Sequence, residues 1–232
     1  KTDYYTYING FKINTAKPNF SVSKDELKER WDFNFHNPKN QSYQEQLNEN
    51  ETKKIVDLVE ICLGIPFNQD ERKAIGNYKI LSPRNILNGF LEETESDNFV
   101  EKDSLNTREK KAILKNGDIL FPRFNREKVS IYVHNSDDNK FIANQHIVIL
   151  RGKNAEYVAT YLNTDSGLNL FNQQIKRHAR GVALPTISIQ DLTNIQIPIL
   201  PIADLEYASK SKLEKLSYDQ LLEIKEKYDL LK

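Results

Sequence analysis

A compact basic run near residue 180 has the residue types that bind phosphates. Lys176, Arg177, His178 and Arg180 fall within five residues, and Gly181 follows them directly. Guanidinium and ammonium groups neutralise phosphates, and an arginine can pair with the edge of a guanine. A glycine lets the backbone turn or approach a duplex closely. The run therefore predicts a DNA contact. The alternative is a solvated helix end, where cations favour the helix dipole.

A second basic group follows the apolar segment ILFP. It contains Arg123, Arg126 and Lys128, and loops on a rigid sheet are where recognition residues accumulate. We expect this loop to contact DNA as well. Surface salt bridges with Glu127 or Asp118 are the alternative.

Several other side chains have both a binding and a structural interpretation. Arg84 and Asn85 follow a proline in a predicted turn; asparagine can pair with adenine, but more often it stabilises the turn itself. Arg84 and Asn85 remain candidate DNA contacts. His146 lies in an apolar segment, and Tyr161 and Phe171 occupy helical positions among leucines. We expect these three in the core.

The charge balance is local. The whole chain has 33 Lys and Arg against 33 Asp and Glu, so its formal net charge is zero. Residues 111–181 nevertheless contain 11 Lys and Arg against 6 Asp and Glu, a balance of +5. DNA binding depends on the local field at the groove, so zero net charge does not exclude it.

The sequence lacks the usual catalytic motifs. The histidines are scattered: His36, His134, His146 and His178. A nuclease-like set of Asp118 with Glu127 and Lys128 fails because adjacent strand residues point to opposite faces. Asn37-Pro38 lacks the second proline and the aromatic residue of an adenine-methylating motif. We expect no metal, no cofactor and no catalysis in this fragment.

Alternating helical and strand-like segments must position the basic groups. We expect helices at 55–63, ended by Gly64, and at 156–163 and 168–178. We expect a turn at 82–83 after a strand, and a turn at 116–117 before one. The other predicted strands cover residues 130–135, 140–151, 186–192 and 194–200.

The two ends differ from this middle part. Near the start, Ser23 and Glu26 form a capping-box pattern for a helix, and residues 39–52 are a polar linker or exposed helix. From Asp204 the chain has no Gly or Pro, which predicts a helix about 43 Å long. One interpretation is an ordinary amphipathic helix that closes the domain; the other is an oligomerisation helix, which the family resemblance described below implies. Its apolar stripe contains Leu213, Leu216, Leu221, Ile224, Tyr228 and Leu231.

Cysteine and methionine usage bear on the origin of the chain. Cys62 is the only cysteine, so no intrachain disulfide can form, and we expect it to be buried in a protein of the reducing cytoplasm. No apolar run reaches membrane-spanning length. Methionine is absent even at position 1, which suggests a piece of a longer polypeptide.

Several blocks occur in the order of one module of the type I restriction-modification DNA specificity subunits. KNGDILFPR resembles that family's "kkGDiL" turn and strand, and YLNTDSG resembles its "yLnS..G" block. The remaining blocks are 55–64, 80–89, 141–151, Gly181, 187–192 and 195–201. The resemblance covers about residues 52–202. It departs from the family after Pro201, where an acidic-Gln pair is missing, and in having a single module.

The resemblance implies a fold and a function. It implies an α+β target recognition domain, a twisted β-structure flanked by helices, with a long C-terminal helix. Such a domain chooses a DNA sequence and catalyses nothing itself. The helix would form an antiparallel pair with a second module, and the partners would be double-stranded DNA, a methyltransferase domain or subunit, and in some systems a restriction subunit.

Residues 19–38 resemble the closing segment of type I adenine-methylating subunits. This implies three parts: a methyltransferase remnant and linker at 1–50, the recognition domain at 51–203, and the helix at 204–232. The S-adenosylmethionine site would lie upstream of Lys1. Two alternatives remain: a helix-mediated interaction or dimerisation module without DNA specificity, or an enzyme that binds the methyl donor itself.

Overall fold

The structure is a computed structural model of the chain. It describes residues 5–8, 11–14, 22, 24–27, 30, 33–38, 41, 43–87, 89–92, 98–101, 105–124, 129–137, 140–181 and 184–206. The C-terminal helix expected beyond 206, with its apolar stripe, lies outside the described residues. So do Arg126 and Lys128.

Short helices alternate with short strands along the chain. The α-helices are α1 (Lys24–Leu27), α2 (Phe33–His36), α3 (Tyr43–Asn48), α4 (Ile55–Leu58), α5 (Thr107–Ala112), α6 (Ala155–Asn163), α7 (Asp165–His178) and α8 (Ile189–Leu192). Two 3₁₀ turns are η2 (Gln69–Glu71) and η3 (Pro83–Asn85).

The strands form several small sheets. The central sheet has the antiparallel order β10 (Tyr132–Val133), β9 (Ile119–Pro122), β12 (Ile147–Arg151), β4 (Glu60–Leu63). A second sheet has the order β11 (Phe141–Ala143), β5 (Tyr78–Leu81), β8 (Asn98–Val100), with β11 parallel to β5. The two-stranded pairs are β1 (Tyr5–Ile8) with β2 (Phe11–Asn14), β3 (Thr52–Lys54) with β13 (Gln196–Pro198), and β6 (Ile86–Leu87) with β7 (Phe90–Leu91).

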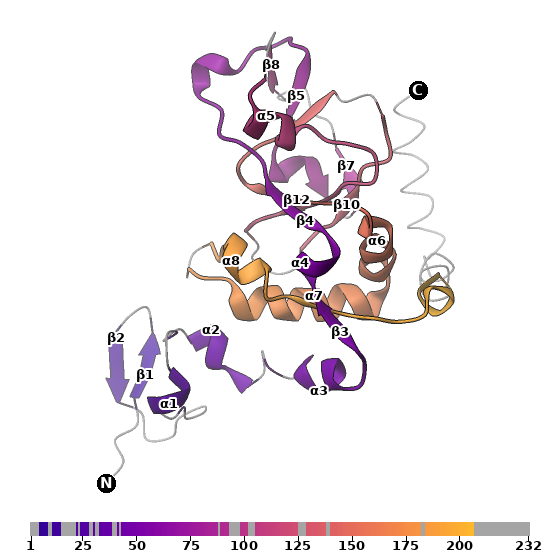
Figure 1. Ribbon diagram of the computed structural model, residues 1–232. Coiled ribbons are helices and arrows are strands. Elements are labelled where there is room, and N and C mark those ends of the chain that lie inside the picture. The colour runs from indigo at the N-terminus through magenta and orange to yellow at the C-terminus, as the bar shows by residue number, and fades with distance from the viewer. Residues whose placement is uncertain are drawn as a thin grey trace, which may run out of the picture.

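These elements are stacked in layers (Figure 1). In that view β5, β8 and α5 lie at the top, the central sheet lies in the middle, and α6 and α7 lie beneath it. The helices α2 and α3 lie below α7. Several small sheets with helices on their faces make this a mixed α+β fold, as the sequence predicts.

The central sheet is covered on both faces, so its two middle strands are apolar except for Arg151 at the end of β12. Side chains alternate between the faces of a strand. Phe121 and Val148 point into the core that contains α6 and α7, and Phe121 meets Phe171 edge to face with 5.4 Å between ring centroids. Leu120 and Ile149 point into a second core cluster on the opposite face. The predicted core positions of Tyr161 and Phe171 are confirmed, and so is the burial of Cys62.

A turn precedes β9, and a buried ion pair links the start of β9 to the end of β12. Gly117 has φ +83, the left-handed conformation that the predicted turn requires. The Asp118 carboxylate accepts a hydrogen bond from the Lys115 amide at 2.8 Å and binds the Arg151 guanidinium with both oxygens. Arg151 also donates to the Ile113 carbonyl at 2.7 Å. The predicted turn and strand are therefore confirmed, and Asp118 is a structural residue.

The helix predicted at 55–63 is wrong beyond its first turn. Only α4 is helical; Val59 has φ −140 and ψ 153, and the chain continues as strand β4. β4 pairs antiparallel with β12, which aligns Cys62 with Ile149. An edge position on the central sheet thus overrides a helix-like spacing of apolar residues.

The strand predicted at 186–192 is also wrong. Residues 189–192 form the helical turn α8, because the Ser188 hydroxyl accepts a hydrogen bond from the Asp191 amide at 3.0 Å as an N-cap. The following strand prediction is confirmed by β13, which pairs with β3 alone in a two-stranded sheet.

His146 is not a core residue. It is exposed in the turn that precedes β12, and the fully buried run begins only at Ile147. The turn is fixed by the His146 amide, which donates to the Asn144 side-chain oxygen at 2.9 Å. The single strand predicted at 140–151 is therefore wrong: the segment forms two strands, β11 and β12, which belong to different sheets and are separated by this turn.

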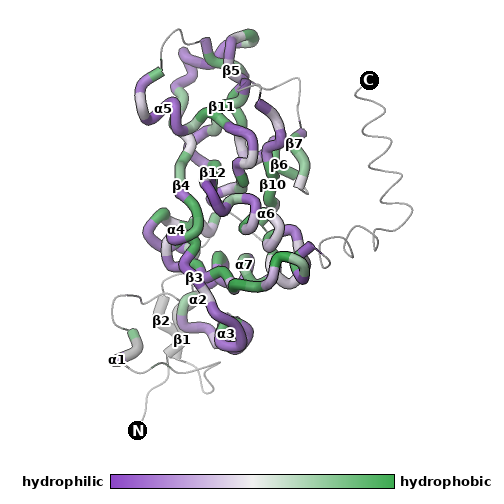
Figure 2. Tube along the Cα trace, turned by 45° about the vertical axis from the view of Figure 1, so that its right-hand side comes forward, coloured by the Kyte–Doolittle hydropathy of each residue, from purple (hydrophilic) through white to green (hydrophobic). Residues whose placement is uncertain are grey.

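The polar segment before β3 contributes to the core. Tyr43 and Leu47 of α3 are buried in the same cluster as α6 and α7, while most other residues of this helix are exposed and hydrophilic (Figure 2). Within the part of the chain that the structure describes, no helix is long and apolar enough to cross a bilayer.

Candidate nucleic-acid interface

Helix α7 carries the basic run at its C-terminal end. Thr164 caps its start by accepting a hydrogen bond from the Gly167 amide at 3.0 Å, and Leu170 and Ile175 lie on its buried face. Lys176, Arg177 and His178 form its last turn, as predicted. Cations at the C-terminal end of a helix interact favourably with the helix dipole. The three side chains point to different surroundings.

Lys176 is exposed to solvent, whereas Arg177 is engaged inside the protein. The Arg177 guanidinium carbon lies 4.4 Å from the centroid of the Phe35 ring. Its Nη1 donates to the Tyr43 hydroxyl at 3.0 Å and its Nε donates to the Phe35 carbonyl at 3.3 Å. Arg177 therefore fastens α2 and α3 onto α7 through cation–π and hydrogen-bonding contacts.

His178 belongs to the same junction. Its ring meets the Phe35 ring edge to face at 5.6 Å, and its side chain is 14% exposed. Its backbone carbonyl, at the end of α7, accepts hydrogen bonds from Nη1 and Nη2 of Arg30 at 3.3 Å each. The Arg30 guanidinium also lies over the Phe35 ring, 4.5 Å from its centroid. We call Arg30, Phe35, Tyr43, Arg177 and Asp191 the junction cluster.

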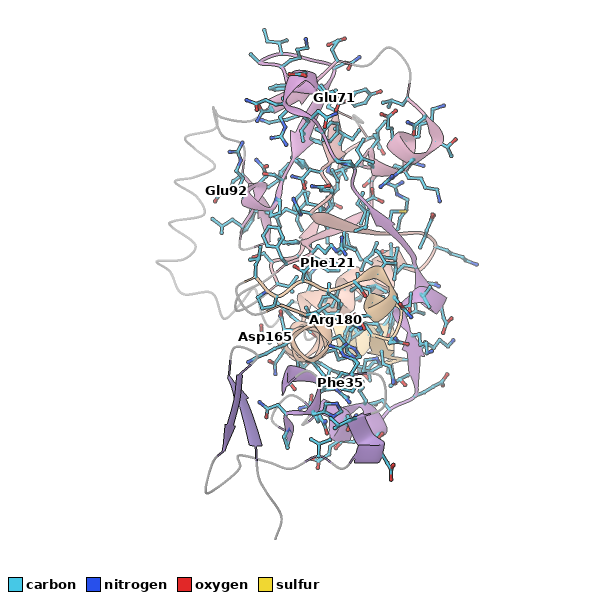
Figure 3. The ribbon with its side chains drawn as sticks, turned by 90° about the vertical axis from the view of Figure 1, so that its left-hand side faces the viewer. Phe35, Glu71, Glu92, Phe121, Asp165 and Arg180 are labelled. Carbon is cyan, nitrogen blue, oxygen red and sulfur yellow. The ribbon has the colours of Figure 1, made fainter. Side chains whose placement is uncertain are left out.

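Asp191 supplies the negative charge of the junction cluster. Its Oδ1 lies 3.2 Å from Nη1 of Arg30, and its Oδ2 accepts from the Ser188 hydroxyl at 2.7 Å. Nε of Arg180 lies 3.4 Å from Oδ2. In Figure 3 the labelled Phe35 lies below Arg180.

The basic run continues into a closed loop. The Arg180 and Thr186 backbones exchange two hydrogen bonds, at 2.9 and 2.8 Å. We call Arg180, Gly181 and residues 184–186, which the structure describes, the closed loop. Gly181 has φ +106, and a Cβ there would lie 3.2 Å from the Leu184 carbonyl oxygen. The Arg180 side chain is 62% exposed despite its contact with Asp191. This loop presents a cation to solvent on a fixed backbone.

The structure brings Arg123 next to this loop. The Ile187 amide donates to the Arg123 carbonyl at 3.1 Å, and Nε of Arg123 donates to the Ile187 carbonyl at 2.8 Å. Phe124 forms an isolated bridge with Thr186. Two basic groups that are far apart in the sequence therefore meet at the end of β9.

Sequence reasoning missed polar residues at the same place. The Arg123 amide donates to the His146 carbonyl at 2.7 Å, and the His146 and Phe124 rings meet edge to face at 5.4 Å. Gln145 and His146 are exposed there. We call Arg123, Phe124, Gln145, His146 and the closed loop the β9-end surface. Its residues come from three segments of the sequence. Backbone pairing brings these segments together, so the sequence alone does not show that they are neighbours.

The sequence also missed Arg30, Phe35 and Asp191. The spacing of Ser188 and Asp191 is a capping pattern that indicates a helical turn, so the helical turn at Asp191 could have been predicted from the sequence. The contact of Arg30 with Asp191 joins segments far apart in the sequence, and no local pattern predicts it.

Arg84 and Asn85 lie in the η3 turn. Asn85 is fully buried; its side-chain oxygen accepts from the Ser82 amide at 2.9 Å and its side-chain nitrogen donates to the Glu92 carbonyl at 2.9 Å. Asn85 stabilises the turn, which is the structural alternative that the sequence offered. Arg84 is exposed on the same turn.

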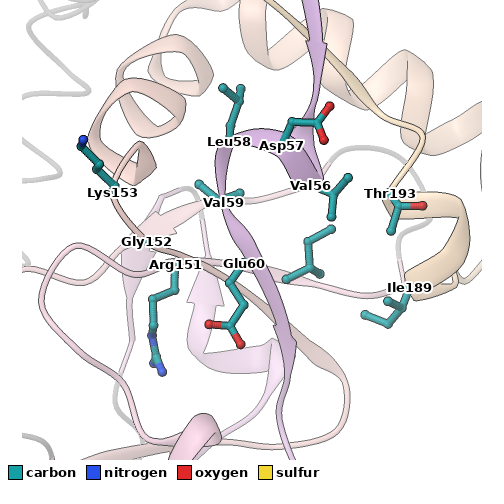
Figure 4. Close-up of a pocket in the computed structure, with 11 residues that line it drawn as sticks. Val56, Asp57, Leu58, Val59, Glu60, Arg151, Gly152, Lys153, Ile189 and Thr193 are labelled. Atoms are coloured by element: carbon teal, nitrogen blue, oxygen red, sulfur yellow. The ribbon is translucent and has the colours of Figure 1, made fainter.

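A shallow pocket of about 500 Å³ lies between α4, β4 and α8 (Figure 4). Val56, Ile61 and Ile189 give it apolar walls, and Glu60 and Arg151 lie among its charged lining residues. Among the described residues, no group of His, Cys, Asp or Glu is arranged to hold a metal ion.

Charges beside this pocket shift three pKa values. The hydrogen bond and charge of Lys111 hold the pKa of Glu60 below its ordinary value. Burial raises the pKa of the Cys62 thiol, and the charge of Glu60 raises it further. Burial opposes the charge of Arg151, but the hydrogen bond and charge of Asp118 outweigh it and raise the pKa of Arg151. All three are explained by structural contacts.

The sequence matches the family described as the type I restriction modification DNA specificity domain over residues 48–224. The chain belongs to this family. The match confirms the family and the DNA specificity function that the ordered blocks indicate, and it confirms that this is a non-catalytic specificity domain.

Solved structures of low sequence identity resemble it. One, described as the structural basis of complex assembly and conformational transition of the type I R-M system, has a TM-score of 0.53 at 11% identity, covering 83% of this chain and 48% of that chain. This similarity shows a shared fold. The type I restriction-modification S subunit from M. genitalium has a TM-score of 0.39 at 19% identity, covering 64% and 34%. The HsdS subunit from Thermoanaerobacter tengcongensis has a TM-score of 0.47 at 14% identity, covering 69% and 35%.

The chain spans between about a third and a half of the length of these three chains. No curated protein has a sequence that matches this chain significantly.

Proposed function

We propose that this chain reads a short DNA sequence on behalf of an adenine-N6-methylating restriction-modification enzyme. The observation that carries the proposal is the convergence of Arg123 and Arg180 at the β9-end surface of a DNA specificity domain. Loops held by a rigid sheet suit recognition, because their side chains project from a fixed backbone.

The geometry sorts the predicted DNA contacts. Lys176 and Arg180 are exposed and available to phosphates. Arg123 donates within the protein and positions the surface. Arg126 and Lys128 remain proposed contacts from the sequence alone. Arg84 stays a more peripheral candidate, on a different turn.

The other residues that the sequence predicts as DNA contacts have structural roles. Arg177 belongs to the junction cluster and the His178 ring packs against its Phe35, while Asn85 stabilises its turn and Gly181 shapes the loop. We therefore propose that Lys176 and Arg180 neutralise phosphates. The exposed Gln145 and His146 extend the surface with groups able to contact base edges.

The parent enzyme is part of the proposal. Residues 19–38 resemble the end of a methylating subunit, so we propose the boundaries 1–50, 51–203 and 204–232 for a methyltransferase remnant, a reader and a C-terminal helix. Double-stranded DNA and a methyltransferase domain would be its partners, with S-adenosylmethionine bound upstream and a restriction subunit in systems that cleave. The helix stripe would pair with a second module.

Selection from random duplexes tests the reading function. The chain is mixed with a pool of random-sequence duplexes, and the bound fraction is sequenced over several rounds. We expect one short motif to be enriched, and we expect affinity for it to fall steeply with salt, because phosphate contacts release counterions. A pool that stays random, or an affinity independent of salt, would contradict the proposal.

The second candidate is a helix-mediated interaction module, supported by the leucine-rich stripe beyond Asp204. This function predicts a tight dimer that is lost when the chain is truncated at Asp204. It also predicts that no DNA motif is enriched. Sedimentation of the full and truncated chains, beside the DNA selection, separates the two functions.

A further inference from the structure

Asp191 contacts cations from two separate parts of the chain. Arg30 belongs to the N-terminal segment and lies 3.2 Å from Oδ1. Arg180 begins the closed loop and lies 3.4 Å from Oδ2. One carboxylate therefore links the segment before the reader to the loop that we propose contacts DNA.

The two ion pairs differ in exposure. The side chains of Arg30 and Asp191 are 11% and 9% exposed, so their pair is largely removed from water. The Arg180 side chain is 62% exposed. A buried pair is costly to break because it leaves an uncompensated charge, whereas an exposed pair contributes little and exchanges readily.

The surroundings of each arginine reinforce this difference. Arg30 also donates to the His178 carbonyl and lies over the Phe35 ring, so its guanidinium is held from several sides. The backbone of Arg180 is held by Thr186, but its guanidinium faces solvent. Arg180 can therefore turn toward a phosphate without disturbing the loop, while Arg30 stays in place.

We propose that Asp191 is a positioning residue that couples DNA binding to the seating of the N-terminal segment. A phosphate competes with Asp191 for Arg180. Once Arg180 turns to the DNA, the carboxylate keeps the Ser188 hydroxyl at 2.7 Å, Arg30 at 3.2 Å and the His178 ring nitrogen at 3.9 Å, and its hold on Arg30 tightens. The proposal rests on the proposed function: the segment that tightens would be the one leading to the methyltransferase.

Coupling of this kind is reciprocal, so a change on the N-terminal side should alter DNA affinity. Arg30 competes with Arg180 for Asp191, whereas Asp191 itself holds Arg180, so replacing Arg30 and replacing Asp191 should have effects of opposite sign. In Arg30→Ala, Asp191 holds Arg180 more strongly, and DNA affinity should fall about fivefold. In Asp191→Asn, Arg180 is released and a negative charge beside the loop is removed, so affinity should rise about fivefold. Structural damage alone would weaken binding in both variants.

A double-mutant cycle tests the route of the coupling. The full chain and its variants are titrated with the duplex enriched in the selection and with a scrambled duplex. We expect the effect of Arg30→Ala to disappear in the Arg180→Ala background. Lys176→Ala serves as the charge-matched control, and its effect should persist in that background.

Hydrogen exchange on the unaltered chain and on Asp191→Asn provides a second measurement. We expect the enriched duplex to slow amide exchange in α3 about fivefold, and Asp191→Asn to abolish this slowing. Unchanged exchange in α3, equal signs for the Arg30 and Asp191 variants, or an Arg30 effect that survives in Arg180→Ala would each overturn the coupling. If the unaltered chain enriches no duplex at all, it is the proposed function that fails.

Discussion

Neighbouring cations of one basic run have different roles at the residue scale. Lys176 faces solvent, whereas Arg177 lies over the Phe35 ring and donates to Tyr43. A run of like charges in sequence is therefore not one surface. Helical geometry turns adjacent residues by about 100°, so one can project outward while the next packs inward.

Replacing Arg177 by alanine should destabilise the fold. The change removes a cation–π contact and two hydrogen bonds, so we expect the free energy of unfolding to fall by about 1–2 kcal/mol. Lys176→Ala should stay within about 0.5 kcal/mol of the unaltered chain, because it removes only an exposed side chain. Urea denaturation measures both, and equal stability of the two variants would contradict the assignment.

Tyr161 should make the fold sensitive to alkaline pH. Burial raises the pKa of its phenol, so the folded protein resists deprotonation that the unfolded chain undergoes from about pH 10. The stabilising preference for the neutral phenol is complete below that pH. Above it the free energy of unfolding should fall, by roughly 1.4 kcal/mol for each pH unit.

Tyr161→Phe isolates this effect. The free energy of unfolding of the variant should fall less steeply between about pH 10 and 11. Urea denaturation at each pH measures this difference. The buried thiol of Cys62, whose pKa is also raised, contributes in the same direction from lower pH and is present in both proteins. Identical pH profiles for the two proteins would refute the role of Tyr161.

Core residues were the easiest to predict. The helical spacing of Tyr161 and Phe171 among leucines places them on a buried face, and the structure agrees. The roles of Arg177 and Asp191 could not be predicted, because their partners Phe35 and Arg30 come from a distant segment. His146 was misplaced because a turn divides the apparently continuous apolar segment 140–151 into two strands, and His146 lies in that turn.

At the element scale, capping and pairing decide what the apolar pattern leaves open. Residues 60–63 read as helix but form an edge strand on β12. Residues 189–192 read as strand but form a helical turn that Ser188 caps. Both segments are short, and a few apolar residues fit either period.

Thr164 should be important for the α6–α7 connection. It is buried, accepts from the Gly167 amide and donates to the Tyr161 carbonyl at 2.8 Å. We expect Thr164→Ala to lower the free energy of unfolding by about 1–2 kcal/mol, as for other lost N-caps. Thr164→Ser keeps the hydroxyl and should retain most of that stability. Thermal or urea unfolding would speak against this role if serine and alanine were equally damaging.

The buried ion pair between β9 and β12 should be worth far more than an exposed one. Asp118→Ala leaves the Arg151 guanidinium without its carboxylate, so we expect a loss of about 3–5 kcal/mol. The control is Glu60→Ala, which removes the exposed pair with Lys111 and should cost less than about 1 kcal/mol. Urea denaturation that ranks Glu60→Ala as the more damaging change would contradict this account.

At the scale of the whole molecule, the N-terminal segment and the reader share one junction. Helices α2 and α3 lie against α7, and the junction cluster holds them there (Figure 1). The end of α7 leads directly into the loop that we propose meets DNA. A change at the DNA surface is therefore close to the segment that precedes the reader.

The fold class and family were predictable at this scale. Ordered blocks such as KNGDILFPR identify a specificity domain, because turn, strand and buried Asp118 act as one unit. The stacking of small sheets and the β9-end surface were not predictable. They arise where Arg123, Phe124 and Arg180 meet the segment at Thr186 and Ile187 through backbone pairing, which leaves no local pattern in the sequence.

The salt dependence of binding to the enriched duplex tests the central claim most directly. Fluorescence titration of the unaltered chain, Lys176→Ala and Arg180→Ala across a salt series gives the slope of log affinity against log salt. The account predicts a steep slope that each variant reduces by about 1, with Glu60→Ala unchanged. A flat slope, or variants that bind the enriched and scrambled duplexes like the unaltered chain, would contradict it.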